Sequence, residues 1–184
     1  MSTGAFQAAA MSVYSVKHYG RTEDKAENAK VLARAAAWLE ATPAANTQDQ
    51  AYRLMGLAWS GGSPAAIAAA VKDLAASQRS DGGWSQFATM ASDAYATGEA
   101  LFALNAAGSM PVTTPVYQNG VKYLLRTQAA DGSWHVASRS IWLQPYFESG
   151  FPYGRDQFIS TAGTAWAAMA HATAAPQLTT SQPR

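Results

Sequence analysis

The feature that most constrains the fold is an internal repeat with a period of fifty residues. The segments 71–84 and 121–134 each read as an amphipathic helix that ends in Gln, followed by a turn with Asp-Gly and then by Trp. Self-similarity over this length indicates a repeat architecture, in which each unit buries its apolar face against the next unit. The sequence therefore predicts a stack of similar helical units.

Two classes of helix alternate along the chain. Helices of the first class carry a single apolar stripe, and they are expected at 26–41, 64–79 and 114–128. Helices of the second class are richer in Ala and Gly, and they are expected at 47–60, 92–107 and 157–173. Because small side chains let neighbouring backbones approach closely, we expect the second class to form an inner layer and the first class an outer layer. A lone helix at about 4–18 would belong to an earlier pair.

Residue types that favour helix starts support these boundaries. Ser63 and Thr114 each stand directly before Pro, and Thr47 begins a capping-box pattern. The sequence thus predicts an all-α fold of stacked αα-hairpins that form about half of an (α/α) toroid. A single domain is expected over 1–173, with a flexible tail over 174–184.

Half a toroid would leave apolar surface at both ends of the stack. Burial of apolar surface contributes roughly 25 cal/mol per Å², so open ends favour association. We therefore expect a homodimer that completes the ring, or a fragment of a longer chain.

Composition excludes several kinds of partner and site. The chain of 184 residues has a net charge of +1 and no basic run, which argues against nucleic acid as a partner. It contains no Cys, so disulfides, Cys nucleophiles and thiolate metal sites are excluded. Residues 1–10 lack a signal-peptide pattern, and no apolar run approaches the about 20 residues of a membrane span. We expect a soluble domain, and its compartment stays open.

The repeated Q-x-x-D-G-x-W element resembles the QW repeat of the squalene–hopene cyclase and oxidosqualene cyclase family. More broadly, the chain is similar over 26–173 to the helical toroids of terpenoid cyclases and protein prenyltransferase β subunits. The resemblance implies that Gln78 and Gln128 bond backbone groups at the end of a neighbouring outer helix. It also implies that Trp84 and Trp134 stack over the Gln amides. These residues would be structural staples.

The chemistry of hopene-type cyclases carries over only in part. Their D-x-D-D-T-A motif protonates an alkene through its central Asp, and the matching segment here runs Asp93-Ala94-Tyr95-Ala96-Thr97-Gly98. Tyr95 stands in place of the central acid, and a phenol is a far weaker proton donor than a carboxylic acid. Asp93 stays a candidate catalytic acid, and its alternative role is to cap the helix that follows. Tyr95 would face a cavity or a neighbouring helix.

Prenyltransferase chemistry would require zinc held by Cys, Asp and His. The chain has no Cys, and its three histidines are far apart without ligand spacing, at His18, His135 and His171. We therefore expect no metal and no cofactor.

The long connection at 141–157 is the strongest candidate for a functional loop. In an aromatic setting Glu148 would have a raised pKa and act as a general acid, with Asp156 as a further catalytic candidate. Arg155 would hold an anionic group. The other residues expected to bind a ligand in this loop are aromatic: Tyr146, Phe151 and Tyr153. The alternative is that Arg155 and Asp156 form a local ion pair and cap, while the aromatic residues fill a lid.

Three functions follow from these observations. The first is a cyclase-like domain that binds an apolar small molecule or a protein partner on its inner-helix face. The second is an enzyme, such as a terpene cyclase, hydrolase or lyase, that uses Glu148, Asp93 or Asp156 as its acid–base group. The third is an oligomerisation module within a larger polypeptide. Whether the chain is an enzyme stays open at this stage.

Overall fold

The structure, a computed structural model, describes residues 4–139 and 146–175. Over those residues the regular structure is entirely helical. Its α-helices are α1 (Ala5–Tyr19), α2 (Lys25–Ala41), α3 (Thr47–Ser60), α4 (Pro64–Ala76), α5 (Ala94–Phe102), α6 (Pro115–Thr127) and α7 (Gln157–Ala174). The 3-10 turns η1 (Thr22–Asp24) and η3 (Gly154–Asp156) precede α2 and α7, and the π-helical segment η2 (Ala103–Ala107) continues α5.

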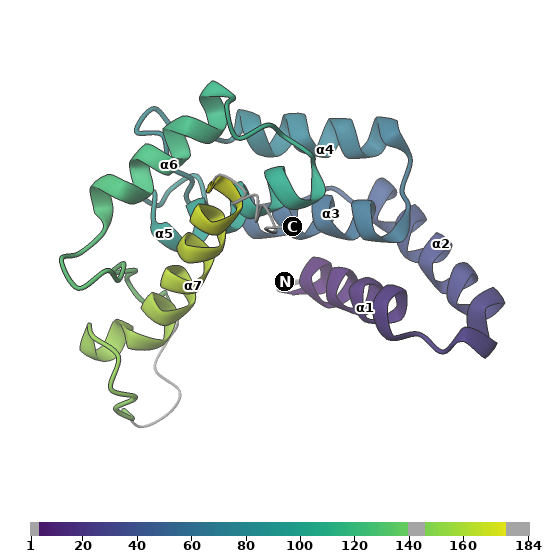
Figure 1. Cartoon of the computed structure of the whole chain (residues 1–184), viewed down its shortest axis with the longest axis horizontal. Helices are drawn as coiled ribbons and strands as arrows, with labels where there is room; N and C mark the ends of the chain where they lie inside the picture. The colour runs from purple at the N-terminus through teal and green to yellow at the C-terminus, as the bar shows by residue number, and fades with distance from the viewer. Residues whose placement is uncertain (1–3, 140–145, 176–184) are drawn as a thin grey trace, which may run out of the picture.

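The helices form an inner and an outer layer, as the sequence predicted. In the inner layer α1 packs on α3, α3 packs on α5 and η2, and α5 packs on α7. Figure 1 shows these helices as an arc, with α2, α4 and α6 along its outer side. This arrangement confirms an all-α stack of helical hairpins that resembles part of a toroid. Among the described residues, no helix is both long and apolar enough to cross a membrane.

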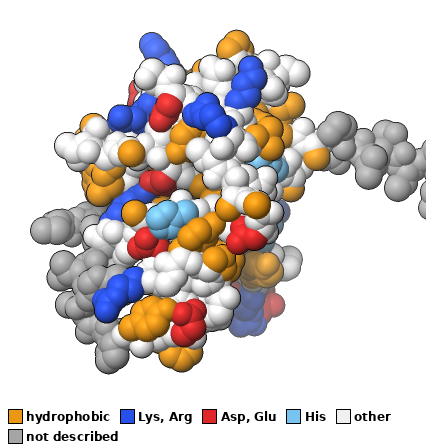
Figure 2. Space-filling view, turned by 90° about the vertical axis from the view of Figure 1, so that its left-hand side faces the viewer, with side chains coloured by type: hydrophobic (Ala, Val, Ile, Leu, Met, Phe, Trp, Pro, Cys, Tyr) orange, Lys and Arg blue, Asp and Glu red, His pale blue; other side chains and the backbone are white. Residues whose placement is uncertain are grey.

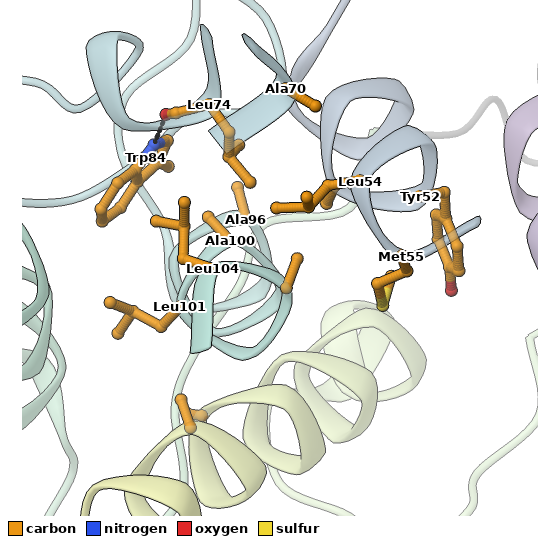
Figure 3. Packing of buried hydrophobic residues seen from close by; sticks show 14 of the residues in the cluster. Tyr52, Leu54, Met55, Ala70, Leu74, Trp84, Ala96, Ala100, Leu101 and Leu104 are labelled. Carbon is orange, nitrogen blue, oxygen red and sulfur yellow. Dashed lines mark hydrogen bonds between the residues drawn. The ribbon is translucent and has the colours of Figure 1, made fainter. Parts of the chain in front are cut away.

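The hydrophobic core lies between the two layers. Leu54, Leu74 and Leu104, from α3, α4 and η2, are fully buried. Figure 3 shows their side chains directed toward one another, whereas Tyr52 lies on the side of α3 away from Leu54. Full burial of such side chains contributes about 1.5–3 kcal/mol each. The outward-facing sides of the inner helices therefore build the core, and the opposite sides stay available for other contacts.

The turns after the outer helices α4 and α6 are held by the repeated Gln and Trp. The Gln78 amide donates to the Gly82 carbonyl at 2.9 Å and to the Val116 carbonyl in the first turn of α6 at 2.8 Å. The Trp84 indole donates to the Leu74 carbonyl at the end of α4 at 2.8 Å. Gln78 thus contacts the neighbouring outer helix as the resemblance implies.

The second copy of the turn repeats most of this pattern. The Trp134 indole donates to the Leu124 carbonyl at 2.8 Å, and the Gln128 amide donates to the Gly132 carbonyl at 2.9 Å. Gly132, like its counterpart Gly82, has a φ of +85°, a conformation that favours Gly. The bond of Gln128 stays within its own turn. Stacking of the Trp rings over the Gln amides stays a prediction.

Helix boundaries follow the predicted caps with two differences. Ser63 and Thr114 accept hydrogen bonds from the backbone of α4 and α6, as predicted. At α3, however, Asn46 is the N-cap, because the Thr47 hydroxyl donates instead to the Ser85 carbonyl at 2.6 Å. Helix α4 ends at Ala76, three residues before the predicted end. Residues 141–145 of the predicted loop and 176–184 of the predicted tail lie outside the described residues.

Small residues bring the inner helices close together. A Cβ atom at Gly98 of α5 would lie 2.5 Å from the carbonyl carbon of Trp166 and 2.6 Å from the amide nitrogen of Ala167 in α7. The two backbones are therefore in direct contact. This close approach places the residues that follow Gly98 in α5 against α7.

Candidate functional site

An aromatic cluster lies on the inner faces of three helices. Tyr95, Glu99 and Phe102 follow one another at four- and three-residue spacing, so they share one face of α5. The Trp166 ring of α7 lies 5.5 Å from the Phe102 ring and 6.5 Å from the Tyr52 ring of α3. We call these five residues the inner-face cluster. Tyr95, Phe102 and Trp166 are half-buried, whereas Tyr52 and Glu99 are buried.

Glu99 is a fully buried carboxyl group within this cluster. Its exposed fraction is 0%, and neither of its side-chain oxygens has a hydrogen-bond partner. Burial, with a smaller effect of the negative charge of Asp49, raises the pKa of Glu99 to about 8. Burial also raises the pKa of Tyr52 and of Tyr95, and the charge of Glu99 adds to both effects. At neutral pH the Glu99 carboxyl is therefore mainly protonated.

Glu99 was not among the residues predicted from the sequence to form a site. A signal was present, because Glu99 is the only charged residue between Ala94 and Ala107, a segment rich in Ala and Leu. Its spacing of four residues from Tyr95 would also have placed the two side chains on one face. What the sequence did not indicate is that the other helices cover this carboxyl completely.

The raised pKa of Glu99 predicts a stability that depends on pH. The unfolded chain loses this proton near the usual value of 4.5, whereas the folded protein keeps it up to about 8. The contribution of Glu99 to stability is therefore highest below pH 4.5 and falls across this window, by up to about 1.4 kcal/mol per pH unit, with no further loss from this group above it. The measurement is the free energy of unfolding in urea as a function of pH. Glu99→Gln should remove this part of the slope, and an equal slope in that variant would contradict the assignment.

A second candidate site is a cavity of about 350 Å³ lined by residues 90–93 and 135–139. We call it the rim cavity, because it lies where α5 begins. Asp93 caps α5 by accepting from the Ala96 amide at 2.9 Å, and it also forms an ion pair with Arg139. Burial lowers the pKa of Arg139. Asp93, predicted as a catalytic acid or a cap, thus has the capping geometry and lines a cavity as well.

His135 links this cavity to the start of α7. Its Nε2 atom lies 2.7 Å from Oδ2 of Asp156, and Oδ1 of Asp156 accepts from the Ser138 amide at 2.8 Å. The bond to His135, with the smaller contribution from Ser138, lowers the pKa of Asp156. Asp156 thus pairs with a histidine that sequence analysis had not assigned to a site.

The predicted loop residues around Glu148 form a separate exposed group. The Tyr146 hydroxyl donates to Glu148, and the Gly150 amide donates to the same carboxylate at 3.0 Å. Both hydrogen bonds lower the pKa of Glu148, and the bond from Tyr146 has the larger effect. The expectation of a raised pKa is therefore wrong, because Glu148 is exposed and accepts hydrogen bonds. The guanidinium carbon of Arg155 lies 6.0 Å from the centre of the Tyr146 ring.

Tyr153 joins the loop to the rim cavity. Its hydroxyl lies 2.6 Å from the Ser133 hydroxyl, and its ring centre lies 4.8 Å from that of His135. Tyr153 has a φ of +83°, which is uncommon for a bulky side chain. The Phe151 ring lies 6.4 Å from that of Tyr153. The predicted site residues are thus divided among three places: the inner-face cluster, the rim cavity and the exposed loop.

The surface charge of the described residues is mixed. Figure 2 shows basic and acidic side chains scattered among apolar ones over one face, without a single-sign patch. The described residues also contain no group of three or more His, Asp or Glu side chains that could hold a metal ion.

The comparisons with known proteins agree with the repeat architecture. A family model described as the squalene-hopene cyclase C-terminal domain matches residues 53–153, more than half of the chain. The matched segment includes α4, α5 and α6, both Gln–Trp turns and most of the inner-face cluster. A comparison with curated proteins found no match. The chain belongs to the squalene-hopene cyclase C-terminal domain family.

Proposed function

We propose that this domain binds an apolar ligand against the inner-face cluster. The observation that carries the proposal is that Tyr95, Phe102 and Trp166 stay half-buried on the inner face, although neighbouring apolar residues of the same helices fill the core. Aromatic side chains gathered on one surface provide apolar contact area with defined geometry. The inner face thus has the composition of a lining, whereas the outer face of the same helices is packed.

The family supports the apolar character of the ligand. Its name refers to squalene, an isoprenoid hydrocarbon, which makes squalene a suitable probe for this chain. Hopene-type cyclases have a protonating Asp at the position where this chain has Tyr95. The Tyr95 side chain is half-buried within the inner-face cluster. We therefore propose binding without proton donation from that position.

Binding of squalene is expected to depend on Trp166. Native mass spectrometry of the domain incubated with squalene should show a bound molecule. Trp166→Ala should weaken binding about tenfold or more, because it removes the ring that contacts both α3 and α5. Trp38→Ala is the matched control, since Trp38 is another partly exposed Trp but lies on the outer helix α2. Equal binding by both variants would place the ligand elsewhere.

The second candidate function is an enzyme with its acid–base group at the rim cavity. The observation that favours it is the contact of 2.7 Å between His135 and Asp156, because an Asp that holds one imidazole nitrogen leaves the other able to take a proton. Asp93 and Arg139 would then position the substrate from the other side of the cavity. This function predicts that the mass of a bound molecule changes with time in the wild-type protein. The change should be lost when His135 is replaced, whereas simple binding predicts no change in mass.

We propose that the domain forms a homodimer. The native mass spectrum recorded with squalene also reports this oligomeric state. Phe158 and Met169 of α7 are exposed at one end of the arc, and Met11 of α1 is exposed at the other. These residues give both ends of the stack apolar surface that a second copy would cover.

A further inference from the structure

Neither the packing of the helices nor contact with an apolar ligand explains why a carboxyl group is buried at position 99. Protein interiors pair more than about 90% of their buried polar groups, because an unpaired donor or acceptor loses its hydrogen bonds to water without replacement. Both oxygens of Glu99 are buried and unpaired. A side chain of similar size without charge, such as Leu or Met, would fill the same space without this cost. Because Glu99 is fully covered, a ligand would supply this missing partner by moving the half-buried Tyr95 and Trp166 side chains aside.

We propose that the ligand of the inner-face cluster is an apolar molecule with a ketone or aldehyde carbonyl, and that the Glu99 hydroxyl donates a hydrogen bond to that oxygen. This inference rests on the proposed function, and it adds the polar group by which the site would select its ligand. The hydrogen bond would satisfy the buried donor of Glu99, and the rest of the ligand would lie against the aromatic rings. No bond is made or broken in this step.

The position of Glu99 suits this role. Tyr95 precedes it by four residues and Phe102 follows it by three on the same face of α5, so the carboxyl lies between two rings of the lining. Trp166 approaches from α7, and its ring lies 5.5 Å from that of Phe102. A ligand held by these rings would have one end directed at the carboxyl.

The protonated form of Glu99 favours an uncharged acceptor over a cation. The titratable groups that face it are Asp49 and Tyr52 of α3 and Tyr95 of α5. Burial and the charge of Asp49 both keep the Glu99 carboxyl neutral, in the form that carries a proton to donate. An ammonium ligand would require the ionised form, which is the minor one at neutral pH. A carbonyl oxygen meets the major form without any change in ionisation.

The test compares two probes of equal chain length, 2-tridecanone and tridecane, by tryptophan fluorescence titration of the whole domain. We expect the wild-type protein to prefer the ketone about tenfold at about pH 6, where Glu99 is protonated. At about pH 10 this preference should disappear, because the ionised carboxyl has no proton to donate. The preference should persist at both pH values in Glu99→Gln, whose amide remains a donor. Glu99→Leu should bind both probes equally.

The outcomes separate this inference from the proposed function. Equal binding of the ketone and the alkane by the wild-type protein near pH 6 would overturn the role of Glu99 and leave apolar binding in place. A ketone preference retained in Glu99→Leu would do the same. If neither probe binds, both proposals fail. Tighter binding of tridecylamine than of the ketone would show a cation site instead, and thermal unfolding of each variant checks that the fold is intact.

Discussion

Replacing Trp84 by Ala is expected to lower the free energy of unfolding by about 3–5 kcal/mol. Trp84 has an exposed fraction of 0%, and Figure 3 shows it beside Leu74, to which its indole is hydrogen-bonded. Its indole closes the end of α4 through the Leu74 carbonyl, and its backbone amide donates to the Thr97 hydroxyl of α5 at 2.9 Å. The substitution would leave a cavity between an outer and an inner helix. Urea denaturation followed by circular dichroism measures the effect.

Two further variants separate packing from hydrogen bonding at this position. Trp84→Phe keeps most of the ring volume but removes the indole donor, so it should cost less than Trp84→Ala. Trp38→Ala is the control for loss of a Trp, because Trp38 is 39% exposed on α2 and should cost less than half as much. A loss at Trp38 as large as that at Trp84 would mean that exposure does not set the energetics of this fold.

Replacing Gly98 by Ala is the second substitution with a large expected effect. In an ordinary helix interior this change stabilises by about 1 kcal/mol, through helix propensity. Here the new Cβ would lie 2.5 Å from the backbone of Trp166, which can move only if α5 and α7 separate. Overpacking of this kind costs about 1–3 kcal/mol or more, so we expect a net loss of about 2 kcal/mol in urea denaturation. Squalene binding should fall with it, because Trp166 would shift.

Gly56→Ala provides the matched control. A Cβ at Gly56 would lie 2.7 Å from Cδ1 of Leu39, and that atom is the end of a side chain that can rotate. The gain in propensity should therefore offset most of the strain, and stability should change by less than about 1 kcal/mol. If Gly56→Ala costs as much as Gly98→Ala, the contact between the α5 and α7 backbones is not the limiting feature.

The two layers of helices could be predicted from the sequence because the information is local and repeated. The stripe that ends in Gln78 and the turn that leads to Trp84 lie within one segment, and a second copy fifty residues later confirms their register. Ser63 and Thr114 were likewise identified as caps from the Pro that follows each of them.

The candidate site could be predicted only in part, because it depends on contacts between distant helices. Tyr95 was expected to face a cavity or a neighbouring helix, and it is half-buried on the face of α5 that also carries Glu99. Nothing within α5 indicates that α3 and α7 bury Glu99 completely, so its pKa and its missing partners could not be foreseen. Similarly, the spacing of Asp156 and His135 in the sequence gives no hint of their contact. The prediction for Glu148 failed because aromatic neighbours in sequence do not imply burial.

The bond from Gln78 to Val116 bears on how a fold of this kind can diverge. Its acceptor is a backbone carbonyl, which every residue type provides, so the amide recognises where a neighbouring helix starts and not which side chains that helix carries. Adjacent hairpins are therefore joined by a contact that places no demand on the sequence of the partner. Substitutions on the inner helices can accumulate without loosening these joints, and the same scaffold can exchange one chemistry for another while the spacing of its hairpins is preserved.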